Sequence, residues 1–148
     1  DSDNQTMIDW VKKQEWSSNQ IGAMGFCIGG HLAFRAAINP EVKSTACFYA
    51  TDLHTNTIPN KPKQHSMERL SDIKGELLMI WGKQDTHIPT EARVQIHQQL
   101  LGTDITFSWH EFNGQHAFMR DEGERYDPEL AAICYQMCLR MFSRTLNN

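Results

Sequence analysis

Two short runs of the sequence are almost entirely apolar, and they constrain the fold more strongly than any other feature. They are residues 45–50, TACFYA, and residues 76–82, ELLMIWG. A strand that is apolar throughout, without alternating polar positions, is typical of a parallel sheet buried on both faces. These runs therefore predict central strands of a sheet covered by helices on both sides.

Helical and strand patterns alternate along the rest of the chain. A polar loop is expected at 52–72, further strands at 21–26 and 105–112, and helices at 4–14, 29–38, 90–101 and 129–146. This alternation favours an α/β fold with about four parallel strands flanked by helices, and we expect one domain over residues 1–148. In such sheets ligands bind beyond the carboxyl ends of the strands. Residues that directly follow a strand are therefore the first candidates for chemistry.

Composition excludes several classes of function. The formal net charge of −4 offers no basic surface for nucleic acid or an anionic membrane, and no apolar run approaches the roughly 20 residues that a membrane helix needs. The four cysteines include no C-x-x-C motif, so we expect free thiols and a cytoplasmic location. No histidine or cysteine spacing is typical of a metal site, and neither a metal nor another cofactor is expected.

Three reactive side chains, Cys27, Asp85 and His116, each follow soon after a predicted strand. Because parallel strands end at one edge of the sheet, we expect these side chains to lie near one another. Their chain order of nucleophile, acid and base is that of α/β-hydrolases, in which G-x-S-x-G places the nucleophile on a strained strand-to-helix turn. Here residues 25–29 read G-F-C-I-G, with cysteine in the position of serine.

The turn at Cys27 admits more than one interpretation. Free cysteine is often buried, so Cys27 could be a small residue packed into a tight turn. If it is a nucleophile, the helix that starts at Ile28 favours the thiolate, and its first N–H groups can hold an oxyanion. His116 would then move the proton and Asp85 would fix its tautomer. A third interpretation is a redox-sensing thiol.

Other residues compete for these roles. Asp52 follows the strand at 45–50, and some α/β-hydrolases place the acid there; Glu111 is a second competitor for the role of Asp85. His87 lies close to Asp85 in the sequence and could touch a ligand. We expect two tryptophans, Trp81 and Trp109, in the core or a pocket wall, and the remaining histidines at the surface or at caps: His31, His54, His65, His97 and His110.

Three segments carry a resemblance to a known family: GFCIGG at 25–30, WGKQD at 81–85 and GQHAFMR at 114–120. They resemble the dienelactone hydrolase family, whose members are carboxymethylenebutenolidase-like, and the resemblance extends over nearly the whole chain. It implies an α/β-hydrolase fold and hydrolysis of enol-lactones or small esters by a Cys-His-Asp triad without a cofactor. It assigns the three roles to Cys27, His116 and Asp85.

The resemblance also implies roles in binding. The backbone N–H of Ile28 would form half of an oxyanion hole, and Arg120 matches a family arginine that binds the substrate carboxylate. A forked guanidinium suits a carboxylate, but Arg120 could instead pair with its neighbours Asp121 and Glu122. We also expect Phe118 to line the cleft.

Members of the family are longer than this chain. We therefore expect residues 1–148 to be the C-terminal portion of the fold. The first strands, the loop with the other oxyanion donor, a glutamate that meets the nucleophile and a second carboxylate-binding arginine would then lie in an N-terminal half that completes the site. If that half is absent from the protein, the alternative is a non-catalytic binding module or an inactive fragment.

Overall fold

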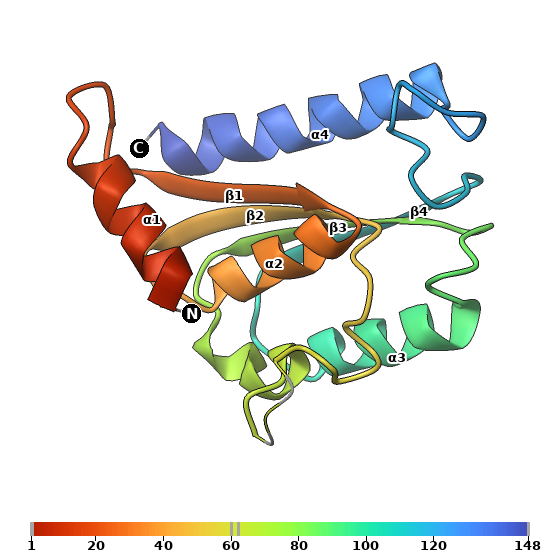
Figure 1. The fold of residues 1–148 in the computed structure, drawn as a ribbon, viewed down its shortest axis with the longest axis horizontal. Helices are drawn as coiled ribbons and strands as arrows, with labels where there is room; N and C mark the ends of the chain where they lie inside the picture. The colour runs from red at the N-terminus through yellow and green to blue at the C-terminus, as the bar shows by residue number, and fades with distance from the viewer. Residues whose placement is uncertain (1, 60, 62, 148) are drawn as a thin grey trace.

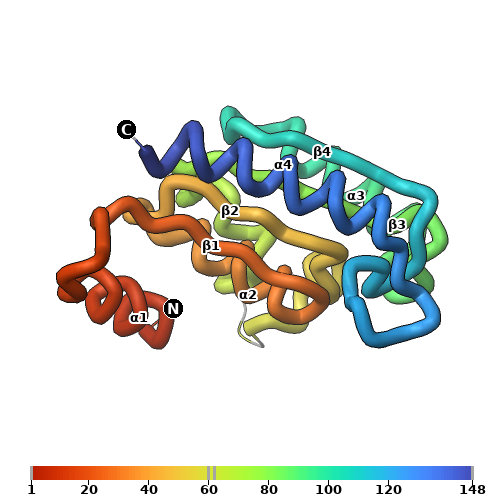
Figure 2. Tube along the Cα trace, turned by 90° about the horizontal axis from the view of Figure 1, so that it is seen from above, coloured from red at the N-terminus to blue at the C-terminus, as the bar shows by residue number. Residues whose placement is uncertain are grey.

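The sheet has four strands, and all of them are parallel. The structure is a computed structural model that describes residues 2–59, 61 and 63–147. The strands pair side by side in chain order (Figures 1 and 2): β1 (Ile21–Phe26), β2 (Val42–Phe48), β3 (Glu76–Gly82) and β4 (Phe107–Phe112). The predicted α/β arrangement with four parallel strands is confirmed.

Helices cover both faces of this sheet. One face carries α4, and the opposite face carries α2 and α3 (Figure 1). The helical elements are α1 (Ser2–Lys12), α2 (Ile28–Ala37), the 3₁₀ helix η1 (Ser66–Asp72), α3 (Thr90–Leu101) and α4 (Pro128–Leu146). Among the described residues, no helix has both the length and the apolar character required to cross a membrane.

The two apolar runs form the centre of the core, as their composition predicts. Strands β2 and β3 are flanked on both sides by other strands, and their side chains are almost completely excluded from solvent, among them Ala46, Cys47, Phe48, Leu77, Met79, Ile80 and Trp81. Burial of these side chains supplies the main stabilisation of the sheet.

Several boundaries differ from expectation: α1 lies at 2–12 rather than 4–14, β4 begins at 107 rather than 105, and two further differences have a clear structural cause. Strand β2 covers 42–48 rather than 45–50, because the chain leaves the sheet at Tyr49, whose φ of 38° is incompatible with an extended strand. The polar segment 52–72 is not entirely loop, since it ends in η1, where Met67 and Leu70 are buried against the core. The polar residues around these two apolar side chains conceal that short helix in the sequence.

The passage from β1 to α2 is unusually tight. A side-chain carbon added to Gly25 would lie only 2.0 Å from the carbonyl oxygen of Gly29, whereas one added to Gly29 would meet nothing within 4 Å. Cys27 sits between them with φ 58° and ψ −125°, a conformation that L residues rarely adopt. Glycine at position 25 therefore allows the strand and the helix to approach closely enough to impose this turn.

The difference in space around Gly25 and Gly29 can be tested by a matched pair of substitutions. Gly25→Ala is expected to lower the free energy of unfolding by about 3 kcal/mol or more, because backbone atoms cannot move out of the way. Gly29→Ala is expected to be neutral or to stabilise the helix by up to about 1 kcal/mol. Urea unfolding of both variants checks this, and equal destabilisation by the two alanines would contradict the described packing.

Candidate active site

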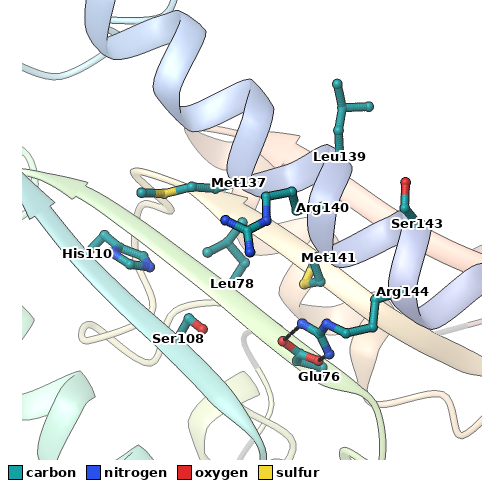
Figure 3. Close-up of a pocket in the computed structure, with 10 residues that line it drawn as sticks. All are labelled: Glu76, Leu78, Ser108, His110, Met137, Leu139, Arg140, Met141, Ser143 and Arg144. Carbon is teal, nitrogen blue, oxygen red and sulfur yellow. Dashed lines mark hydrogen bonds and ion pairs between the residues drawn. The ribbon is translucent and has the colours of Figure 1, made fainter.

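Two hollows deserve comparison as candidate sites. A groove of about 720 Å³ lies under α4 beside β3 and β4, and its lining includes an ion pair between Glu76 and Arg144 at 2.6 Å (Figure 3). Its lining contains no cysteine: Glu76, Leu78, Ser108, His110, Met137, Leu139, Arg140, Met141, Ser143 and Arg144. A second cavity, of about 560 Å³, contains both Cys27 and His116.

This second cavity lies where the theory of parallel sheets places ligands, at the carboxyl ends of the strands. Its walls come from the end of β1, the residues that follow β2, β3 and β4, and the first half of α4. They consist of Phe26, Cys27, Tyr49, His87, His116, Ala117, Met119, Arg120, Arg125 and Tyr135. Its size is within the range of small-molecule sites, so we take this cavity as the candidate active site.

Backbone hydrogen bonds hold Cys27 in its unfavourable conformation. Its N–H donates to the carbonyl of Phe48 at 3.0 Å. Its carbonyl accepts from the backbone N–H groups of Gly30 at 3.0 Å, Thr51 at 3.2 Å and His31 at 3.3 Å. The side chain is partly exposed, in contrast to the other three cysteines. The interpretation of Cys27 as a residue packed away inside a turn does not fit this exposure.

Asp85 and His116 form the central contact of the site. His116 Nδ1 lies 2.7 Å from Asp85 Oδ2, and both residues are buried. Because the carboxylate can only accept, Nδ1 donates and carries the proton, which leaves Nε2 without one in the neutral ring. The imidazole is therefore held in the tautomer that a general base requires.

The loop after β3 aims the Asp85 carboxylate. Its Oδ1 accepts from the backbone N–H groups of His87 at 2.8 Å and Ile88 at 3.2 Å. The carbonyl of Ile88 in turn accepts from the buried side chain of Arg93 on α3, at 2.8 Å. Asp85 thus has a hydrogen-bond donor on each oxygen and little freedom to turn away from His116.

The competing carboxylates do not contact His116. Glu111 accepts from Arg93 Nε at 3.2 Å and from Trp109 Nε1 at 3.0 Å, so it serves the packing of α3 on β4. Asp52 lies partly exposed in the segment after β2, at a positive φ of 60°. Of these three carboxylates, only Asp85 is hydrogen-bonded to the imidazole.

Aromatic rings surround His116. The ring of Tyr49 meets it edge-on with centroids 5.1 Å apart, and the exposed ring of His87 lies 4.5 Å from it. Burial raises the pKa of the Tyr49 phenol, which stays protonated. These contacts restrict rotation of the His116 ring, and they place His87 at the cavity wall, where a ligand could touch it.

Two arginines reach the cavity, and the sequence interpretation included only one of them. Arg120 lines the wall as expected, and no ion pair joins it to Asp121 or Glu122 within the part of the chain that is described. Arg125 lines the same wall, although its surroundings in the sequence, RDEGER, are typical of a solvated loop. The sequence feature that could have indicated this position is that Arg125 lies in the same predicted loop as His116.

Two expectations are wrong. Phe118 is fully buried beneath the site, packed against Tyr49 at 5.4 Å between ring centroids, and does not line the cavity. It follows His116 by two residues, but the turn there directs it into the core. His31 is not at the surface or a cap either, because it is 1% exposed on the inner face of α2.

The thiol and the imidazole line the same cavity. No hydrogen bond between the Cys27 thiol and His116 is present among the residues described. In free enzymes such contacts are often long and close only around a substrate. The N–H of Ile28, the first residue of α2, likewise has no acceptor in the described part of the chain, so it is available to a ligand. Within those same residues, no cluster of three or more histidine, cysteine or acidic side chains could hold a metal ion.

Comparison with known proteins identifies the group to which the chain is similar. Residues 1–146 match the sequence pattern of the Dienelactone hydrolase family. A putative carboxymethylenebutenolidase from Saccharomyces cerevisiae is 34% identical over 153 residues, covering 99% of this chain and 56% of that protein. A carboxymethylenebutenolidase from Pseudomonas putida is 26% identical over 88% of this chain and 51% of its own length. The chain therefore spans about half the length of these curated relatives.

Solved structures show the same fold. A putative dienelactone hydrolase from Klebsiella pneumoniae superposes with a TM-score of 0.85 at 24% identity, covering 95% of this chain and 59% of that one. The dienelactone hydrolase-like promiscuous phosphotriesterase P91 from metagenomic libraries gives a TM-score of 0.79 at 18% identity, covering 96% and 59%. At sequence identities this low, the superpositions establish only that the fold is shared, so the chemistry has to be argued from the residues of the site.

The role of Asp85 can be tested without any substrate. In Asp85→Asn, the amide oxygen is expected to keep the bonds from His87 and Ile88, so the NH₂ group faces His116 and the imidazole changes to the Nε2–H tautomer. The matched variant Asp52→Asn should leave the Nδ1–H tautomer in place. Nitrogen-15 NMR of the histidine ring at pH 7.5 distinguishes the tautomers. An Nδ1–H signal that survives in Asp85→Asn would refute the assigned contact.

Proposed function

The chain belongs to the dienelactone hydrolase family, and on that basis we propose that it carries the catalytic residues of a hydrolase for small esters or lactones. Cys27 is the nucleophile, His116 the base and Asp85 the residue that holds His116. The observation that carries the proposal is the 2.7 Å contact between Asp85 and the His116 Nδ1, beside a cavity whose lining includes both His116 and a thiol on a strained turn.

The proposed reaction has two stages. His116 Nε2 takes the thiol proton of Cys27 as the sulfur bonds to the substrate carbonyl carbon, and the carbonyl oxygen becomes an oxyanion held by the Ile28 N–H. The C–O bond to the leaving group then breaks, and His116 returns the proton to that oxygen. In the second stage water attacks the thioester, His116 takes a water proton, and the thiol leaves with that proton.

An activated ester or a strained lactone suits this site, since its leaving group departs easily. The relatives whose names state an activity are carboxymethylenebutenolidases, and the lactone substrate comes to this chain only as part of the proposal. Because those relatives are about twice as long, we assign the second oxyanion donor and part of the pocket wall to residues outside 1–148. A cytoplasmic location also belongs to the proposal, in keeping with four free cysteines.

Arg120 is proposed to bind a carboxylate of the substrate. It reaches the cavity wall beside His116 and carries no other described ion pair. A guanidinium that faces a cavity offers two parallel donors to a carboxylate, so the proposed substrate is an anionic ester or lactone.

Replacement of the nucleophile provides the main test of function. In the complete protein, Cys27→Ala is expected to lower kcat for an enol-lactone or an aryl ester by at least about 10³-fold while thermal unfolding is unchanged. Cys138→Ala is the matched control: burial raises the pKa of that thiol to about 11, it lies outside the cavity, and kcat should stay within about twofold. Undiminished turnover by folded Cys27→Ala would end the proposal.

The role of Arg120 is tested by a pair of substrates. Arg120→Gln is expected to raise KM for a carboxylate-bearing lactone by about 10- to 100-fold, since a charge-assisted hydrogen bond is lost. KM for a neutral aryl ester such as p-nitrophenyl acetate should change by less than about twofold. Equal effects on the two substrates would show that Arg120 does not select for charge.

A further inference from the structure

Helix α2 buries a polar cluster that the proposed reaction does not use. His31 is 1% exposed, and its Nε2 lies 2.6 Å from the hydroxyl of Ser66, the first residue of η1. Arg35, one turn further along the same helix face, donates to that hydroxyl at 3.2 Å and to the carbonyl of Gln64 at 3.0 Å. One face of α2 therefore holds the far end of the segment between β2 and η1.

The same histidine also holds the near end of that segment. His31 Nδ1 lies 2.8 Å from the carbonyl oxygen of Thr51. The N–H of Thr51 donates to the carbonyl of Cys27 at 3.2 Å. The peptide groups around Thr51 thus stand between a buried imidazole and the backbone of the proposed nucleophile.

The partners determine which atoms carry protons. A carbonyl only accepts, so His31 Nδ1 is a donor. Its Nε2, unprotonated in the neutral ring, accepts from the Ser66 hydroxyl, whose oxygen in turn accepts from Arg35. The bonds from Arg35 to Ser66, from Ser66 to His31 and from His31 to the Thr51 carbonyl thus run in one direction, and each polarises the next. The N–H of Thr51, which donates to the Cys27 carbonyl, belongs to the preceding peptide group, so the link to Cys27 depends on the position in which Thr51 is held.

We infer that His31 is a positioning residue for Cys27, acting through Thr51 to hold the strained turn in its reactive conformation. The inference rests on the proposed function, because it gives the turn a catalytic purpose. Cys27 has a φ of 58°, and a residue in such a conformation keeps it only where the surroundings impose it. The hydrogen bond from the Thr51 N–H to the Cys27 carbonyl is one of the contacts that impose this conformation. His31 fixes the next peptide group along the chain, because it donates to the Thr51 carbonyl.

The bond from the Ser66 hydroxyl to Nε2 requires a neutral imidazole, whereas the bond from Nδ1 to the Thr51 carbonyl, the tie to Thr51, survives protonation. A second proton on His31 would turn Nε2 into a donor, and two cations, His31 and Arg35, would then share the Ser66 oxygen. Burial lowers the pKa of His31 from its ordinary value near 6.5; Arg35 lowers it further, and the bond to Thr51 and the charge of Asp52 oppose the shift. Arg69 on η1 adds positive charge near Arg35. Because the pKa is depressed in the folded protein, the stability that this neutral arrangement contributes is complete above about pH 6.5 and is lost as the pH falls through the lowered value.

Two substitutions separate the two ends of the imidazole. In His31→Asn the amide nitrogen occupies the place of Nδ1 and can still donate to Thr51, whereas in His31→Gln the amide nitrogen occupies the place of Nε2 and the donor to Thr51 is lost. In the complete protein, His31→Gln is expected to accelerate hydrogen exchange of the Thr51 amide about tenfold and to lower kcat for p-nitrophenyl acetate about tenfold, with KM within twofold. His31→Asn and the control Ser66→Ala, which keeps the donor to Thr51, should stay within about threefold of the unsubstituted protein in both measurements.

If His31→Gln leaves the hydrogen-exchange rate of the Thr51 amide unchanged, the inference is wrong. It is also wrong if His31→Asn and His31→Gln lower kcat equally. The unsubstituted protein supplies a test that needs no variant: nitrogen-15 NMR at pH 7.5 should show His31 with a proton on Nδ1 and none on Nε2. A proton on Nε2 alone would contradict the tie to Thr51, and a doubly protonated ring would contradict the neutral arrangement at Ser66. If the unsubstituted protein hydrolyses no ester, the proposed function fails, while the exchange and tautomer measurements still decide whether the tie exists.

Discussion

The close approach of the Gly25 and Gly29 backbones is the constraint on which the candidate site depends. With no room for a side chain at position 25, β1 passes directly into α2, and the residue between them takes a φ of 58°. The amino end of α2, with its unsatisfied N–H groups, consequently follows directly after Cys27, which lines the cavity. The side chain of Cys27 leaves the sheet at that point and is neither covered by the core nor fully open to water.

Parallel topology brings the other groups to the same place. Because β1, β3 and β4 all end at one edge of the sheet, loops that are distant in sequence deliver Asp85 and His116 beside Cys27. A second layer of buried polar contacts then fixes those loops. Arg93 holds the loop of Asp85 through the Ile88 carbonyl, and His31 holds the segment that contacts the carbonyl of Cys27. Each of these buried donors has an acceptor, so the layer adds rigidity without leaving an unpaired group.

The elements that sequence predicts well are those whose burial is visible in a local pattern. The runs at 21–26 and 76–82 form strands with those boundaries, and α3 covers 90–101 as expected between Pro89 and Gly102. Chain order and strand ends also indicated that Asp85 and His116 would meet, since the topology of a parallel sheet leaves few other arrangements.

The remaining features depend on tertiary contacts that no local pattern encodes. His31 is polar and follows two glycines, and only its partners Thr51 and Ser66, 20 and 35 residues away, reveal that it is buried. Phe118 was assigned to the cleft, and Arg125 was given no role there, for the same reason: the path of the loop after β4 decides which side chain enters the core and which reaches the cavity.

The central claim is that a thioester forms on Cys27 during turnover, and peptide mass spectrometry tests it directly. The complete protein is mixed with an aryl ester, quenched in acid within the first turnover, and digested. The account predicts that the added mass of the acyl group appears on the peptide that contains Cys27, and that it disappears on longer incubation. Turnover with no acyl group on that peptide, or with the group on another residue, would contradict the account.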